Sequence, residues 1–159
     1  MNKTINHLQN LARLVNSTNS NVYGIYQFIL DHGVKFNVTE ASFPKLGKPK
    51  ECFFNATKLV LDSFKYTYCE GFAFGQVLPV IHAWCIDGKG NVIDPTWSSG
   101  SDYIGIPFSN KYLIQRLSKT GYYGSLIDNF QEDFPLLTGK HNINKVIHPC
   151  AATLKASLV

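Results

Sequence analysis

The stretch PVIHAWCIDGKGNVIDPTW, residues 79–97, decides how this chain folds. Two apolar runs, residues 80–86 and 91–97, flank the polar segment DGKG at residues 87–90. Apolar runs separated by a short glycine-containing turn are typical of a β-hairpin, because glycine readily adopts positive φ. The sequence therefore predicts two antiparallel strands joined by a turn at residues 87–90.

Apolar residues at helical spacing predict three helices before this hairpin. Residues 4–16 and residues 22–32 carry such patterns, and Gly33 is expected to end the second helix as its C′ residue. A third helix is predicted over residues 52–63, with Phe64 on its apolar face. Residues 34–50 contain prolines and a glycine and are predicted to form an irregular loop.

The second half of the chain has more aromatic residues and predicts further strands. Residues 66–74 and 103–107 are predicted strands. A fourth helix is predicted around residues 112–117, with its end near Gly121, whereas residues 124–139 match no single pattern. Helices followed by an antiparallel sheet predict an α+β fold in which the N-terminal helices pack on the sheet.

Length and composition limit the class of protein. A chain of 159 residues with 45% hydrophobic and 16% charged residues is expected to form one folded domain over residues 1–159. The net charge is +4, but the only arginines are Arg13 and Arg116, so nucleic-acid binding is not favoured. No apolar run is long enough for a membrane span, and polar residues interrupt the N-terminal MNKTINHLQNLARL. We therefore expect a cytoplasmic protein that binds neither nucleic acid nor a membrane.

Four cysteines are present, and their spacing bears on metal binding. Cys52, Cys69, Cys85 and Cys150 include no C-x-x-C pair, which argues against a structural zinc site. Without a secretion signal, we expect these cysteines to be reduced thiols rather than disulfides.

Cys52 is the candidate nucleophile. It stands at the start of the third predicted helix, two residues after Lys50 and three after Pro49. A thiol in the first helical turn faces the positive end of the helix dipole and unpaired backbone N–H groups, which stabilise a thiolate. The same N–H groups can bind a developing oxyanion. The structural alternative is a small buried cysteine at the start of a helix.

His82 lies in the middle of an otherwise apolar strand. A histidine there has lost hydration and needs partners, so it is either a hydrogen-bonded core residue or a base. Alternation along the strand puts His82 and Trp84 on one face and Cys85 on the other. This parity disfavours a zinc site that His82 and Cys85 would share. Trp84 and Trp97 are expected to pack in the core, with stacking on a substrate as the alternative.

Asp94 lies on the returning strand and also needs a partner. It can orient the imidazole of His82, or it can cap the turn that follows at residues 95–96. A two-residue turn would point Asp94 away from His82, because it changes which residues share a face. We therefore predict a bulge with Gly90 in the left-handed conformation. Asp94 would then lie opposite His82, with a carboxylate oxygen about 2.8 Å from a ring nitrogen.

Together, Cys52, His82 and Asp94 supply a nucleophile, a base and a group that orients the base. The segment HAWCIDGKGNVIDPTW, residues 82–97, resembles the HAW and DPT motifs of the transglutaminase-like, papain-like cysteine peptidase superfamily. In that superfamily the cysteine opens a helix, and the histidine and aspartate come from adjacent antiparallel strands. The resemblance covers residues 50–108 and implies these three roles, in this order, on a papain-like core.

A second cysteine competes for the role of nucleophile. The stretch YCEGFA, residues 68–73, is similar to the C-x-G-Y-A motif that often surrounds the nucleophile in that family, so Cys69 is the other candidate nucleophile. Only 12 residues separate Cys69 from His82, too few for a helix, a turn and the approach to a strand, whereas Cys52 leaves 29. We therefore favour Cys52.

The second oxyanion donor departs from the family pattern. Papain-like enzymes often carry a glutamine shortly before the cysteine, and residues 43–51 contain none. Asn55, one helical turn after Cys52, is the candidate, and a solvent-facing Asn55 is the alternative.

The predicted function is a cysteine hydrolase or acyltransferase that acts on an amide, isopeptide or ester bond. Its substrate would be a peptide, a protein or a small amide, and neither a cofactor nor a metal is expected. The alternative is an inactive binding or inhibitory module on the same fold that targets a host or partner protein. A zinc deaminase would need H-x-E and P-C-x-x-C motifs, and neither occurs.

Overall fold

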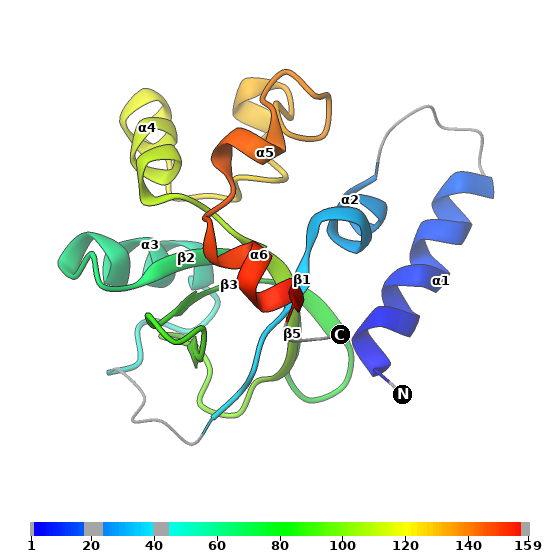
Figure 1. The fold of residues 1–159 in the computed structure, drawn as a ribbon, viewed down its shortest axis with the longest axis horizontal. Helices are drawn as coiled ribbons and strands as arrows, with labels where there is room; N and C mark the ends of the chain where they lie inside the picture. The colour runs from blue at the N-terminus through cyan, green and yellow to red at the C-terminus, as the bar shows by residue number, and fades with distance from the viewer. Residues whose placement is uncertain (1, 18–23, 40–44, 157–159) are drawn as a thin grey trace.

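The structure is a computed structural model that describes residues 2–17, 24–39 and 45–156. Helices and strands are mixed in it, as the α+β prediction requires (Figure 1). The α-helices in the described part are α1 (Lys3–Ser17), α2 (Ile25–His32), α3 (Cys52–Asp62), α4 (Asn110–Thr120), α5 (Ile143–Val146) and α6 (Cys150–Ala156). The strands are β1 (Val34–Lys35), β2 (Thr67–Phe74), β3 (Pro79–Ile86), β4 (Val92–Ile93) and β5 (Ser101–Pro107), and a 3₁₀ turn, η1, covers Phe130–Glu132.

The five strands form one antiparallel sheet in the order β1-β5-β2-β3-β4. The long strands β2 and β3 occupy its middle, and Gly71 of β2 lies opposite His82 of β3. A Cβ at Gly71 would come within 2.2 Å of the Ile104 carbonyl oxygen on β5. Glycine is therefore needed at the register position that faces the candidate base.

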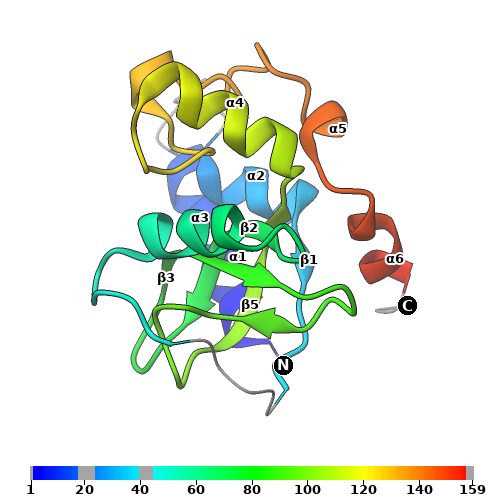
Figure 2. The same cartoon turned by 90° about the vertical axis from the view of Figure 1, so that its left-hand side faces the viewer.

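Helices cover the sheet and enclose two apolar clusters. The larger cluster joins α1, α2, α3 and α4 to one face of the sheet, through residues such as Leu8, Ile29 and Val60. The smaller cluster contains Trp84 and Tyr103 and is completed by α6. In Figure 2, α3 lies across the strands and α4 lies further out on the same side. No helix in the described segments has the length and apolar character that crossing a bilayer requires.

The hairpin between β3 and β4 has the predicted bulge. Gly90 has φ +82° and its N–H donates to the Asp87 carbonyl at 3.0 Å, which closes a type I turn followed by a left-handed glycine. The register pairs Cys85 with Ile93, so the next position would place Asp94 opposite Trp84, two positions from the predicted partner His82. Because side chains alternate between the two faces of a sheet, a shift of two positions keeps the Asp94 side chain on the face of His82.

Four local predictions need correction. Gly33 ends α2, but in an extended conformation (φ −72°, ψ 158°), and glycine is required there because a Cβ would lie 2.5 Å from the Ile29 carbonyl oxygen. Phe64 is exposed, because α3 already ends at Asp62. The strand predicted over residues 91–97 is only β4, since Asp94 leaves the ladder to bind other groups.

The fourth correction concerns residues 34–50, which are not all loop, since β1 pairs with β5 at the edge of the sheet. Two residues are too short a strand to carry a periodic signal. The predicted start of the second helix at residue 22 and the part of this segment at residues 40–44 lie outside the described residues.

Candidate active site

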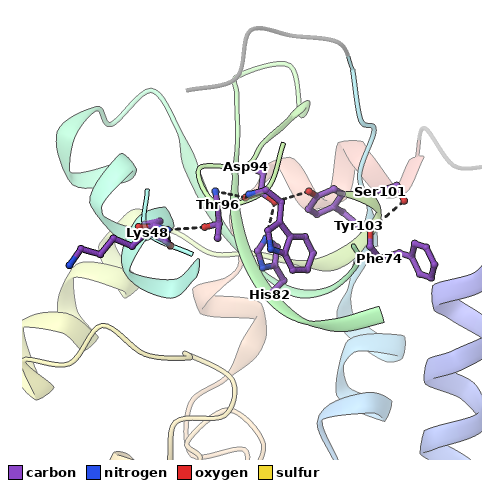
Figure 3. A network of polar contacts seen from close by, with 9 residues as sticks. Lys48, Phe74, His82, Asp94, Thr96, Ser101 and Tyr103 are labelled. Carbon is purple, nitrogen blue, oxygen red and sulfur yellow. Dashed lines mark hydrogen bonds and ion pairs between the residues drawn. The ribbon is translucent and has the colours of Figure 1, made fainter. Parts of the chain in front are cut away.

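His82 and Asp94 are joined by a short hydrogen bond in the interior. His82 Nε2 lies 2.8 Å from Asp94 Oδ2, and both side chains are buried (Figure 3). The distance and the shared face are those predicted from the bulged hairpin. Because Nε2 is occupied by the carboxylate, Nδ1 is the imidazole nitrogen left for a second partner.

Asp94 fills both of the roles that the sequence left open. Oδ2 accepts from His82 and from the Tyr103 hydroxyl at 2.7 Å, while Oδ1 accepts from the backbone N–H groups of Thr96 at 2.8 Å and Trp97 at 3.0 Å. Burial alone would raise the pKa of Asp94, but the bonds from His82 and Tyr103 and the His82 charge lower it below its usual value. The carboxylate is therefore ionised and fixed in orientation.

Trp97 covers the imidazole of His82. The two rings are stacked with centroids 3.8 Å apart and planes 9° apart. Stacking of Trp97 on His82 was not predicted, since the alternatives considered were core packing and stacking on a substrate, while Trp84 is buried in the core as expected.

The Cys52 thiol is close enough to His82 to affect the pKa of the imidazole. Burial would lower the pKa of His82, but hydrogen bonding to Asp94 and to Cys52, and the charges of both, raise it above its usual value. Cys52 is the first residue of α3 and is partly exposed. The structure therefore brings together the three residues that the sequence singled out.

The first turn of α3 leaves its amide groups available at the site. Lys50 adopts a left-handed conformation (φ 65°) and turns the chain into the helix. Glu51 is the N-cap residue, but its side chain makes no capping hydrogen bond, and the first helical bond runs from the Asn55 N–H to the Glu51 carbonyl at 2.8 Å. The N–H groups that precede Asn55 in α3 have no intrahelical acceptor, and they lie beside the Cys52 thiol.

Asn55 is neither solvent-facing nor a free oxyanion donor, so both readings of it were wrong. Its side chain is buried, and Nδ2 donates to the Lys48 carbonyl at 2.9 Å and to Thr96 Oγ1 at 3.0 Å. Both amide hydrogens are thereby used. Asn55 instead joins the start of α3 to the segment after Asp94 through these two hydrogen bonds.

The other three cysteines lack the surroundings of Cys52, although all four are free thiols. Burial raises the pKa of Cys69 and of Cys85 above the usual thiol range. Cys150 begins α6 and is partly exposed. The histidine that it contacts is His148, which accepts from the Cys150 backbone N–H. Within the described part of the chain, no three His, Cys, Asp or Glu side chains gather as metal ligands would.

Two features of the site were not predicted. Tyr103 was recognised only as the start of a strand, although a buried tyrosine hydroxyl generally needs a partner, and this one binds Asp94. An open groove of about 510 Å³ lies beside Trp97 and is bounded by the β2–β3 turn and the segment after Asp94. Its lining comes from three separate segments, so no local sequence pattern indicates it.

Comparison of the chain with protein-family models, with curated proteins and with solved structures found no match.

Proposed function

We propose that the protein is a thiol hydrolase or acyltransferase that uses Cys52, His82 and Asp94 on an amide, isopeptide or ester bond. The observation that carries the proposal is the arrangement around His82: one ring nitrogen is bound to a buried carboxylate, and the thiol of Cys52 is its other partner. Burying the His82–Asp94 pair costs free energy of solvation, which hydrogen bonds to further partners offset.

In the first step, the Cys52 thiolate attacks the carbonyl carbon and forms a C–S bond. The carbonyl electron pair moves to oxygen, and the first-turn N–H groups of α3 stabilise the resulting oxyanion. Collapse of this intermediate breaks the bond to the leaving nitrogen or oxygen. The protonated His82 donates its proton to that atom, and an acyl-enzyme remains on Cys52.

In the second step, water or an amine attacks the acyl-enzyme. His82 accepts a proton from the attacking atom, the C–S bond breaks, and Cys52 leaves as a thiolate. Asp94 contacts no substrate and acts as a positioning residue, since it fixes the imidazole tautomer in which Nδ1 faces Cys52. The raised pKa of His82 favours the protonated imidazole that the first of these transfers needs.

The arrangement of elements supports a papain-like core. A helix that begins at the candidate nucleophile packs on an antiparallel sheet whose adjacent strand and hairpin supply His82 and Asp94. This is the order and context that the resemblance implies.

The test is acylation by p-nitrophenyl acetate followed by peptide mapping. We expect a burst of p-nitrophenolate and one acetyl group on Cys52. Cys52→Ala should abolish the burst and leave the fold intact, because this partly exposed first-turn side chain contributes little packing. Cys150→Ala is the matched control, since Cys150 is also partly exposed and also begins a helix but does not face His82.

The outcomes separate the two functions left open by the sequence. Equal acetylation of Cys52 and Cys150, or a burst that persists in Cys52→Ala, would contradict the proposal. A folded protein that is not acetylated at Cys52 would favour the inactive binding module instead.

A further inference from the structure

The groove beside Trp97 has a lining of mostly aliphatic side chains. The side chains of Leu46, Val77, Leu78 and Val80 line it together with the indole of Trp97. Val77 and Leu78 are 79% and 58% exposed. Aliphatic residues exposed to this degree are common singly, but their convergence on one hollow marks a binding surface.

The groove shares a wall with the candidate catalytic base. Trp97 stacks on the imidazole of His82 and also lines the groove. Val80 lies two residues before His82 on the same face of β3, which places the two about 7 Å apart along the strand. A group bound in the groove therefore lies beside the indole that covers the imidazole of His82.

The groove lies on the side of His82 rather than on the side of Cys52. No α3 residue is among the residues that line it. In the proposed mechanism, the acyl group is attached to Cys52, whereas the leaving group departs toward the imidazole that protonates it. The groove is therefore placed to hold the leaving group, or the attacking amine in the reverse step.

The chemistry of the lining selects an uncharged occupant. The described residues of the groove carry no charged side chain, and its polar members are Gln76, Thr96, Ser98 and Ser99. A charged side chain would lose hydration against this lining without gaining an ion pair. An aliphatic side chain would remove apolar surface from water, worth about 25 cal/mol per Å².

We infer that the protein is selective for substrates whose leaving amine or alcohol carries an aliphatic side chain, which binds in the groove beside Trp97. The inference rests on the proposed function and adds to it the chemical class on the leaving-group side. The same site would favour an aliphatic amine as the acyl acceptor.

Capture of the acetyl-enzyme tests this preference without knowledge of the natural substrate. The enzyme acetylated by p-nitrophenyl acetate is offered leucine amide, glycine amide or lysine amide. In each case the amine nitrogen attacks the thioester, a C–N bond forms, the C–S bond breaks, and His82 takes the proton. We expect leucine amide to be acetylated at least about tenfold faster than the other two amides. Equal rates would overturn the inference and leave the proposed function standing.

A pair of valine variants locates the effect. Val80 in the groove and Val38 outside it are 44% and 45% exposed. Val80→Lys should remove the preference for leucine amide, because it replaces part of the aliphatic lining of the groove with a charged side chain. Val38→Lys should retain the preference. If the two variants behave alike, the groove is not the site of selectivity.

Tryptophan fluorescence provides a readout that does not need catalysis. The chain has two tryptophans, and Trp84 is fully buried, so a ligand in the groove contacts only Trp97. In Cys52→Ala, leucine amide should change the fluorescence saturably and glycine amide should not, and Trp97→Phe should abolish the change. Absence of a saturable change would overturn the groove as a binding site even if no acyl-enzyme forms.

Discussion

Asp94 is the residue on which the candidate site depends most. Its two oxygens accept four hydrogen bonds, from a ring nitrogen, a phenol and two backbone N–H groups. The donors approach from different directions, so the carboxylate cannot rotate away from His82 without leaving a buried donor unpaired. This satisfied network explains how a carboxylate can be buried in an apolar sheet.

The first prediction concerns the pKa of His82. Asp94 holds it above the usual value of about 6.5, whereas burial alone would lower it. In Asp94→Asn burial remains and the anion is lost, so the pKa should fall from its value in the unmodified protein. Titration of the imidazole by NMR measures both values. A His82 pKa below 6.5 in the unmodified protein would contradict the assignment.

The raised pKa of His82 also determines how the stability of the fold changes with pH. Because the folded-state pKa of His82 is raised, the pair stabilises the fold below about pH 6.5, and this contribution is lost as pH rises through the folded-state pKa. Urea unfolding at several pH values should show this decline in the unmodified protein and not in Asp94→Asn.

The second prediction assigns Tyr103 as a positioning residue. Tyr103→Phe removes one donor to Asp94 and should lower kcat about tenfold while destabilising the fold by about 1–2 kcal/mol. Tyr68→Phe is the matched control, since the Tyr68 hydroxyl also donates to a buried carboxylate, that of Glu70, at 2.9 Å. Both variants should lose stability, but only Tyr103→Phe should shift the His82 pKa. An unchanged His82 titration in Tyr103→Phe would leave Tyr103 a purely structural role.

At the scale of elements, the hairpin of β3 and β4 brings the site together. A glycine in the left-handed conformation allows the odd-length turn that keeps Asp94 on the face of His82. The third prediction is that Gly90→Ala destabilises the fold by about 1–2 kcal/mol, because an L-residue is strained there. Its Cβ would also approach the Leu154 side chain at 2.8 Å.

The control for this prediction is in the same turn. A Cβ at Gly88 would have nothing within 4 Å, and its φ is not positive, so Gly88→Ala should leave the melting temperature nearly unchanged. Equal melting temperatures for the two variants would show that Gly90 is not required in its left-handed conformation.

The sequence predicted this element well because its signals are local. Alternation, the DGKG turn and the cost of a buried carboxylate were sufficient to infer the shared face and the distance between His82 and Asp94. The exact pairing was missed by two positions, because the capping bonds that Asp94 makes to residues 96 and 97 draw it out of the ladder. Asn55 was misassigned because its partners, Lys48 and Thr96, come from separate segments.

At the scale of the whole molecule, Glu70 attaches the C-terminal third to the sheet. This buried carboxylate on β2 accepts from the Ser125 hydroxyl and from the backbone N–H groups of Leu126 at 2.8 Å and Ile127 at 3.1 Å. Residues 124–139 carried no periodic pattern, and the partner that anchors them lies more than fifty residues earlier. Their placement could not be predicted from local sequence.

The fourth prediction is that Glu70→Gln destabilises the fold by about 2–3 kcal/mol, because the amide NH₂ would face donors and leave a buried one unpaired. Glu51→Gln is the control, since Glu51 is exposed and makes no capping bond. The free energy of unfolding in urea measures both. Equal stability of the two variants would show that Glu70 is not an anchor.

The proposed activation of Cys52 by His82 can be measured as the rate at which iodoacetamide alkylates Cys52. At pH 7, peptide mapping over time should show Cys52 labelled first and Cys150 much later, with Cys69 and Cys85 protected by burial. In His82→Gln, labelling of Cys52 should slow by about tenfold or more, since Cys52 loses the proposed base that takes its proton, while labelling of Cys150 stays the same. Labelling of Cys52 at the same rate with and without His82, or labelling of Cys150 first, would contradict the account.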